Sequence, residues 1–426
     1  MIRFAVLLTL LFNGLLSSTS AASKPNVLFI LADDVGREVL GCYGGESYRT
    51  PQLDQLAATG KRFEHCYAMP VCHPTRIALL TGRYPRHIGS PKWGSFPKHA
   101  EKQTFAHVMK SAGYATAIAG KWQICTLGKE PDHPQRLGFD ESSLFGWHEG
   151  ARYHEPMIYQ NGKVRTDTAG KYGPDLYVDF LIDFMQRHKD GPFFAYYSMA
   201  LCHDVTDDLK EPVPYGEHGR YDNYREMAEN MDRCVGRLVD ALDRMGVRED
   251  TLILFTTDNG TAKRSIIRAE NGKYLRDPVV SVMNGKEVPG GKGDLTDWGT
   301  RVPTIANWPG VIQPGSVDNS LIDLSDFLPT FAELGSGKLP TGVPLDGHSF
   351  AGLLAEDGST KRTWAYAESR GNRYFVKTQD WKLYDNGRLF NTERDPDEKR
   401  QLKEADVPAS ELSVLKQAMS SLKTRK

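Results

Sequence analysis

The sequence predicts a doubly wound α/β protein, and three observations support that prediction. Short apolar runs alternate with amphipathic stretches along most of the chain, as they do where helices cover both faces of a sheet. Several of these runs are apolar at every position, which is typical of parallel strands buried on both faces. The chain has 426 residues, of which 40% are hydrophobic and 25% charged, so it can bury a large core.

Four buried strands and four helices follow from these patterns. The strands are expected at residues 26–32, 114–119, 193–199 and 251–257. The helices are expected at residues 51–59, 104–111, 177–187 and 224–245. Residues 263–300 are rich in glycine and charge and have no clear periodicity, and loops of that length in compact domains are usually functional or disordered.

The C-terminal part of the chain has a different sequence pattern. From residue 363 onwards short strand-like runs alternate with turns, and a polar helix is expected from Ala409. This pattern predicts a smaller subdomain with an antiparallel sheet, divided from the rest between residues 335 and 362. We therefore divide the chain into a main domain, residues 23–350, and a C-terminal subdomain, residues 351–426.

The first 22 residues have the pattern of a secretory signal. Arg3 is their only charge, an apolar run covers residues 4–16, and residues 17–22 are small, with cleavage expected after Ala22. A membrane anchor is the alternative, but the run is short for a span and is interrupted by Asn13 and Gly14. No later stretch is long enough to span a membrane. An exported protein, periplasmic or secreted and without a stable membrane span, is therefore expected.

Charge and cysteine content exclude two classes of protein. The 53 Lys and Arg against 54 Asp and Glu give a formal net charge of −1, which excludes the broad basic surface of a protein that coats nucleic acid. Any site that binds an anion must therefore be formed by a local cluster of positive groups rather than by a broad basic surface. The six cysteines have no repeated spacing and do not define a disulfide framework.

Polar residues follow each of the four predicted strands. Any one of them has an ordinary interpretation as a turn, a helix cap or a solvated side chain. The carboxyl ends of parallel strands meet at one edge of a sheet, however, so these groups are expected to share a site. They are Asp33, Asp34, Lys121, Gln123, His203, Asp258 and Asn259. Their carboxylate and amide oxygens suit Ca²⁺ or Mg²⁺ better than Zn²⁺.

The segment Cys72-His73-Pro74-Thr75-Arg76 precedes an apolar helical run. Pro74 suits the first turn of a helix, which places Cys72 at or just before the N-terminus, where backbone N–H groups favour an anion. That position also lowers a thiol pKa, so a thiolate nucleophile is one interpretation and a buried structural cysteine is the other. The spacing of the cysteines and histidines around it matches none of the usual zinc patterns.

This segment, continued by Leu80-Thr81-Gly82-Arg83, resembles the Cys-x-Pro-x-Arg signature of the formylglycine-dependent sulfatases. Further segments resemble other blocks of that family in the same order: residues 26–34, 41–45, 50–54, 120–122, 257–260, 290–293, 301–303 and 389–398. The resemblance implies an alkaline-phosphatase-like fold and the hydrolysis of sulfate monoesters. It also implies that Cys72 is oxidised to Cα-formylglycine by a formylglycine-generating enzyme.

The resemblance assigns roles position by position. Asp33, Asp34, Asp258 and Asn259 match the calcium ligands, with the modified Cys72 completing the set, although Mg²⁺ stays open. Arg76 matches the residue that holds the formylglycine hydrate, Lys121 and Lys292 match the pair that binds the sulfate oxygens, and His203 matches the histidine near the leaving-group oxygen. One hydroxyl of the hydrate attacks sulfur, and the other, once deprotonated, allows sulfate to be expelled.

Two departures from the family pattern leave alternatives open. Gln123 stands where most members have a histidine, and glutamine can hydrogen-bond but cannot act as a base. His203 lacks the usual flanking prolines. The alternatives are a phosphomonoester or phosphodiester hydrolase of the same superfamily, and a catalytically weakened carbohydrate-binding relative.

The substrate expected from the resemblance and the polar, aromatic rim is a sulfated carbohydrate. Rim candidates are taken from loops, which carry specificity in many enzymes. They are Trp147, His148, Arg152, His154, Arg264, Arg268 and Trp298.

Overall fold

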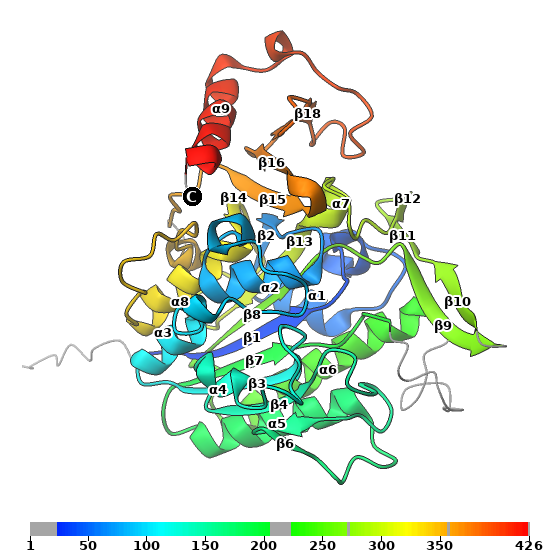
Figure 1. Ribbon diagram of the computed structural model, residues 1–426, viewed down its shortest axis with the longest axis vertical. Helices are drawn as coiled ribbons and strands as arrows, with labels where there is room; N and C mark the ends of the chain where they lie inside the picture. Colours follow the sequence, from blue (N-terminus) through cyan, green and yellow to red (C-terminus); the bar gives the residue numbers. More distant parts are fainter. Residues whose placement is uncertain (1–23, 205–222, 271–272, 356–357, 425–426) are drawn as a thin grey trace, which may run out of the picture.

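The computed structural model describes residues 24–204, 223–270, 273–355 and 358–424 (Figure 1). The expected signal segment therefore lies outside the described residues. Within the described part, no helix combines the length and the apolar character that a membrane crossing requires.

A ten-stranded sheet forms the centre of the molecule, with the order β14-β2-β13-β8-β1-β7-β3-β4-β5-β6. β1 (Asn26–Ala32) lies in its middle, parallel to both β7 (Phe193–Ser198) and β8 (Thr251–Thr257). β3 (Ala115–Lys121) continues the parallel set beside β7. The predicted α/β fold with a large, mostly parallel sheet is therefore confirmed, and all four predicted strands belong to this parallel set.

Six further strands of this sheet were not predicted. They are β2 (Lys61–Tyr67), β4 (Glu141–Phe145), β5 (Tyr159–Gln160), β6 (Lys163–Val164), β13 (Arg301–Asn307) and β14 (Ser316–Asp323). β13 is antiparallel to both β8 and β2, so the sheet is mixed on this side. Most of these strands carry charged or polar side chains, and their short sequences do not stand out as continuous apolar runs.

Helices cover both faces of the sheet, and alternate residues of β1 bury their side chains on opposite faces. Leu28 and Ile30 join one core cluster, which includes residues of α1 (Pro51–Ala58), α5 (Gly173–His188) and α6 (Tyr224–Met245). Val27, Phe29 and Leu31 join another with residues of α2 (Cys72–Thr81), α3 (Phe105–Ser111) and α8 (Phe327–Gly335). A short helix, α4 (His133–Arg136), lies in the loop after β3.

The stretch 263–300 is more regular than its sequence suggests. It forms one hairpin from β9 (Arg264–Glu270) and β10 (Lys273–Pro278), and a second from β11 (Val280–Met283) and β12 (Lys286–Pro289). The short helix α7 (Asp297–Thr300) follows. Cross-strand pairing supplies the order here, and such pairing leaves little trace in the pattern of a single segment.

The C-terminal residues form the expected small antiparallel sheet. Its strands are β15 (Ala365–Ser369), β16 (Arg373–Lys377), β17 (Trp381–Tyr384) and β18 (Leu389–Asn391). Together with α9 (Ala409–Thr424) it lies at one end of the molecule, at the top of Figure 1. Its hydrophobic core is shared with the rest of the molecule, because Tyr67 of β2, Ala78 of α2 and Leu321 of β14 belong to the same cluster. The domain boundary at residue 351 stays a prediction.

Candidate functional site

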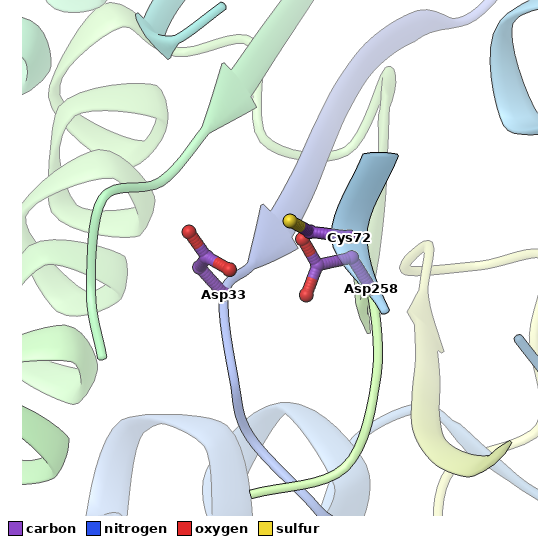
Figure 2. A group of neighbouring side chains, drawn as sticks. All are labelled: Asp33, Cys72 and Asp258. Atoms are coloured by element: carbon purple, nitrogen blue, oxygen red, sulfur yellow. The ribbon is translucent and has the colours of Figure 1, made fainter. Parts of the chain in front are cut away.

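The carboxyl ends of the central parallel strands meet at one edge of the sheet, and the predicted polar residues lie there. Asp33 follows β1, Asp258 follows β8, and Cys72 is the first residue of α2. The ligand atoms of these three buried residues lie within 4.8 Å of one another. Figure 2 shows the Cys72 sulfur near the two carboxylates, although the three residues are far apart in the sequence.

Local backbone geometry places Cys72 at the start of its helix. Val71 is extended, with φ −145° and ψ 153°, and the helix runs from Cys72 to Thr81 with Pro74 in its first turn. Gly82 ends it in the left-handed region at φ 65°. The expectation of a lowered thiol pKa is wrong, because burial raises the pKa of Cys72 and the nearby Lys121 and Lys292 offset this only in part.

Each of the three carboxylates at the site is paired with a cation. Lys121 forms a fully buried ion pair with Asp33. Lys292 Nζ lies 2.6 Å from Asp34 Oδ2. The third pair joins Arg76 to Asp258 and is described next.

Arg76 is fixed by two partners. It donates to Asp258 Oδ2 from Nη2 at 2.7 Å and from Nε at 3.1 Å. Its Nη1 also donates to Ser198 Oγ at 2.5 Å, and that hydroxyl donates to the Lys121 carbonyl at 2.6 Å. Ser198 ends β7 and was not predicted, because a serine that closes an apolar strand has no distinctive sequence signal.

The crowding of charges shifts several pKa values. Burial alone would raise the pKa of Asp33, but the Lys121 ammonium and other cations hold it well below its usual range. Burial and the neighbouring Asp33 raise the pKa of Asp258 to about 7. Burial, followed by the positive charge of Lys292, lowers the pKa of His203 to about 4. Adjacent carboxyl groups whose pKa values shift in opposite directions, such as Asp33 and Asp258, are common at functional sites.

Unpartnered oxygens make the site suitable for a divalent cation. Asp33 Oδ1 and Asn259 Oδ1 are buried and have no hydrogen-bond partner within the described residues. Asn259 Nδ2 donates to Asp34 Oδ1 at 2.8 Å, which fixes the orientation of the amide. Buried polar atoms without partners are rare and often mark an ion site. Carboxylate and amide oxygens are hard ligands, so the residues fit Ca²⁺ or Mg²⁺.

One other cluster of metal-ligand types occurs in the described part of the chain, formed by Glu101, Glu130 and His133. Arg136 already forms ion pairs with both of its carboxylates. The cluster is therefore an ion-pair network. All six cysteines are free of disulfide bonds, and His73 Nε2 lies 2.8 Å from the Ser95 carbonyl oxygen.

His203 and Lys292 line a cavity of about 470 Å³ at the edge of this site. The His203 side chain is 26% exposed, and its Nε2 lies 3.9 Å from Asp34 Oδ2. Tyr153 donates its hydroxyl proton to the His203 carbonyl at 2.7 Å, which anchors the loop after β7. Gln123 is buried two residues beyond the end of β3, with a left-handed φ of 43°.

The rim candidates divide into two groups. His148, Arg152 and Arg264 line the same cavity as His203. Trp147, His154 and Trp298 do not line it. Trp147 packs against Trp93, the backbone of His154 pairs with that of Tyr172 in an isolated β-bridge, and Trp298 donates to Asp397 at 2.9 Å. The side chain of Arg268 lies outside what the structure describes.

The backbone of Trp298 explains why two positions of the motifs, Gly260 and Gly291, have no room for a side chain. A Cβ at Gly260 would lie 1.9 Å from the Trp298 carbonyl oxygen, and one at Gly291 would lie 2.2 Å from the Trp298 carbonyl carbon. Only glycine allows backbones to approach this closely. These contacts hold the loop of Asn259 against the loop of Lys292.

Comparisons with known proteins agree with this arrangement. A family model described as Sulfatase matches residues 25–337. The chain is similar to the N-acetylgalactosamine-6-sulfatase of Sus scrofa, with 31% identity over 88% of this chain and 74% of that protein. Arylsulfatase A of Homo sapiens is 32% identical over 83% and 72%. The crystal structure of the sulfatase PsFucS1 from Pseudoalteromonas sp. superposes with a TM-score of 0.74 and 26% identity, covering 94% of this chain and 91% of that one.

Proposed function

Because the chain belongs to the sulfatase family and is a sulfuric ester hydrolase, we propose that it uses a formylglycine made from Cys72 and a bound calcium ion. One observation supports this most directly. Cys72 is buried at the N-terminus of α2 with the carboxylates of Asp33 and Asp258 within 4.8 Å. A cysteine whose pKa is raised by burial suits a residue whose function depends on modification rather than on its own thiolate.

The proposed metal ligands are Asp33, Asp34, Asp258, Asn259 and the modified Cys72. The unpartnered oxygens of Asp33 and Asn259 support this assignment. A bound Ca²⁺, or Mg²⁺ in its place, would act as a Lewis acid toward an ester oxygen.

The proposed chemistry assigns a separate task to each side chain. Hydrated formylglycine supplies one hydroxyl that attacks sulfur and a second that allows sulfate to be released without attack by water. Arg76, fixed by Asp258 and Ser198, orients the residue at position 72. Lys121 and Lys292 stabilise the negative charge on the sulfate oxygens.

His203 is proposed to protonate the departing alcohol, with the negative charge of a bound sulfate ester raising its pKa from about 4 so that the ring carries the proton. Its ring lines the cavity and is partly exposed, so it can reach a leaving group that enters from solvent. Gln123 is proposed as a substrate-binding residue that donates or accepts hydrogen bonds without acting as a base. Its presence favours, as a second candidate, a catalytically weakened relative that binds carbohydrate.

The proposed substrate is a sulfated carbohydrate, and two features support it. One relative is named as a sulfatase of N-acetylgalactosamine 6-sulfate. The cavity at His203 also carries His148, Arg152 and Arg264, polar side chains suited to sugar hydroxyl and acidic groups. Export to the periplasm or the medium, directed by residues 1–22, is part of the same proposal.

Mass spectrometry of the peptide that contains Cys72 tests the proposal. Conversion replaces SH and H by a carbonyl oxygen, so the peptide should be about 18 Da lighter than its cysteine form. The protein should be produced in its native host or together with a formylglycine-generating enzyme. An unmodified thiol together with no activity on any sulfate ester would contradict the proposal. Faster hydrolysis of an aryl phosphate than of the matching aryl sulfate would favour a phosphoesterase.

A further inference from the structure

A second cavity, of about 520 Å³, lies beside the N-terminus of α2. Three segments far apart in the sequence line it: the start of α2, the loop that contains Trp93, and residues 368–372 of the C-terminal sheet. Val71 and His73, the neighbours of Cys72 in the chain, belong to its wall. Its volume is within the range of about 300–1,000 Å³ that is usual for ligand sites. We call it the Trp93 cavity.

Trp93 offers an aromatic surface in this cavity. Its side chain is 41% exposed, which is unusual for so large an apolar group. It is held in place by Trp147, whose ring centroid lies 5.6 Å away at an interplanar angle of 59°. The face of an indole ring is electronegative and attracts the C–H bonds on one face of a pyranose ring. An exposed tryptophan in a cavity is therefore a suitable platform for a sugar.

The charges in the Trp93 cavity favour an anion. The guanidinium carbon of Arg370 lies 4.5 Å from the centre of the Trp93 ring, and Lys92 lines the same cavity. The one carboxylate in the wall, Glu368, already accepts hydrogen bonds from the Arg86 backbone at 2.9 Å and from the Tyr366 hydroxyl at 2.7 Å. Guanidinium and ammonium groups beside an aromatic ring suit a sugar that carries sulfate or carboxylate.

One pair of neighbouring residues connects the walls of the Trp93 cavity and the cavity at His203. Trp147 contacts Trp93, and its neighbour His148 lines the cavity at His203. The two rings of this pair are 5.3 Å apart. A chain of linked sugars that passes this pair would reach both cavities.

From these observations we propose that the Trp93 cavity binds a further sugar of an anionic oligosaccharide whose sulfate ester lies at Cys72. The sugar ring contacts the part of the Trp93 ring that Arg370 does not cover, and its sulfate or carboxylate group binds Arg370 and Lys92. This inference rests on the proposed sulfatase function for the ester itself. It adds that the substrate is an oligosaccharide rather than a single sulfated sugar.

Competition against a fluorogenic aryl sulfate tests the inference. The probes are disaccharides and hexasaccharides of chondroitin sulfate, heparin and carrageenan, each pair matched in composition. At least one hexasaccharide should inhibit with a Ki about tenfold or more below that of its disaccharide. Trp93→Ala and Arg370→Ala should each raise that Ki about tenfold. The inference is overturned if hexasaccharides and disaccharides inhibit equally, or if neither substitution changes their ratio.

Arg388→Ala is the matched control. Arg388 also stacks on an aromatic ring of the C-terminal sheet, with its guanidinium carbon 4.7 Å from the centre of Tyr384, but it does not line the Trp93 cavity. This variant should keep the hexasaccharide Ki of the unsubstituted protein. Equal losses in Arg388→Ala and Arg370→Ala would indicate a general effect on the sheet and would overturn the inference.

A binding measurement separates this inference from the proposed function. Calorimetric titration of the unmodified full chain with the same hexasaccharides needs no turnover. Binding that is lost in Trp93→Ala, in a protein that hydrolyses no sulfate ester, would support the cavity and contradict the function. Hydrolysis of sulfate esters without binding of any hexasaccharide would support the proposed function and overturn the proposal that the Trp93 cavity binds a sugar.

Discussion

The Lys382 ammonium donates a hydrogen bond to Asp297 at 2.8 Å, and both side chains are buried. Lys377 lies 3.3 Å from the same carboxylate. Burial alone would raise the pKa of Asp297, but these two lysines hold it well below its usual range. Since Asp297 follows the loop of Lys292 closely in the chain, this contact ties the C-terminal sheet to the proposed sulfate-binding residues.

We expect Asp297→Asn to destabilise the protein by about 3 kcal/mol, because buried Lys377 loses its carboxylate partner and Lys382 keeps only Glu398. Denaturation in urea, followed by fluorescence, measures this loss. Lys399→Ala is the control, since it breaks an ion pair with Asp397 whose lysine side chain is 79% exposed. That variant should leave the free energy of unfolding nearly unchanged. Equal effects of the two substitutions would contradict the expectation.

Chelation should abolish activity reversibly. Treatment with EGTA followed by dialysis is expected to remove hydrolysis of an aryl sulfate, and added Ca²⁺ should restore it. Because a ligand that binds only the folded protein stabilises it, the melting temperature should fall with the chelator and recover with the ion. Parallel additions of Mg²⁺ distinguish the two candidate metals. Full activity after exhaustive chelation would contradict the proposed metal site.

Ser198→Ala should lower kcat/KM for an aryl sulfate by about tenfold, because Arg76 loses one of its two anchors and can turn away. Arg76→Lys should cost more, about a hundredfold, since a lysine cannot reproduce the forked contact with Asp258. Steady-state kinetics on protein with equal formylglycine content measures both effects. A larger loss for Ser198→Ala than for Arg76→Lys would contradict this order.

Gln123→His should raise kcat by about tenfold or more, because it introduces a general base at the position where most family members have a histidine. Histidine tolerates the left-handed φ of 43° at this position better than most residues. The rate should also gain a new dependence on pH near neutrality. Gln123→Asn is the control, which keeps the amide and offers no base. A lower rate for Gln123→His would indicate that another group already accepts the proton.

Stability should depend on pH through His133, a buried residue outside the proposed metal site. Its Nδ1 accepts a hydrogen bond from Trp122 Nε1 at 3.1 Å, and burial, assisted by Arg136, lowers its pKa to about 4. The unfolded chain keeps a pKa of about 6.5, so it binds more protons than the folded chain between these values. The contribution of His133 to stability should therefore rise as pH increases from about 4 to about 6.5, by about 3 kcal/mol, and then level off.

His133→Gln should remove this contribution, because glutamine can accept the Trp122 hydrogen bond but does not titrate, whereas His65, whose pKa burial lowers to about 3, still titrates. Urea denaturation at a series of pH values provides the measurement. His99→Gln, at an exposed histidine, is the control and should leave the pH dependence as it is. A pH dependence that is the same with and without His133→Gln would place its origin elsewhere.

Much of the candidate site could be predicted from the sequence because of how parallel sheets are built. Asp33, Lys121 and Asp258 each stand at or beyond the end of an apolar strand, and parallel strands end at the same edge. The position of Cys72 followed from Pro74 in the first turn of its helix. The family resemblance then supplied Lys292, which comes from a glycine-rich segment without periodicity.

Other parts could not be predicted, since they depend on contacts between distant segments. Ser198 acquires its position only because β7 lies beside both β1 and β3. The Trp93 cavity needs the C-terminal sheet to pack next to α2, and no pattern within either segment indicates this. The thiol pKa of Cys72 was predicted wrongly because the helix N-terminus was considered without the burial that opposes it.

The burial of Cys72 also sets an order of events during biosynthesis. Only 3% of this residue is exposed in the folded protein, so a modifying enzyme could not reach its sulfur once α2 has packed. If Cys72 is oxidised, the oxidation must precede folding, and a molecule that folds first would be locked in its unmodified form. The fraction of active protein would then depend on the rate of modification relative to the rate of folding, before the chain reaches its final compartment.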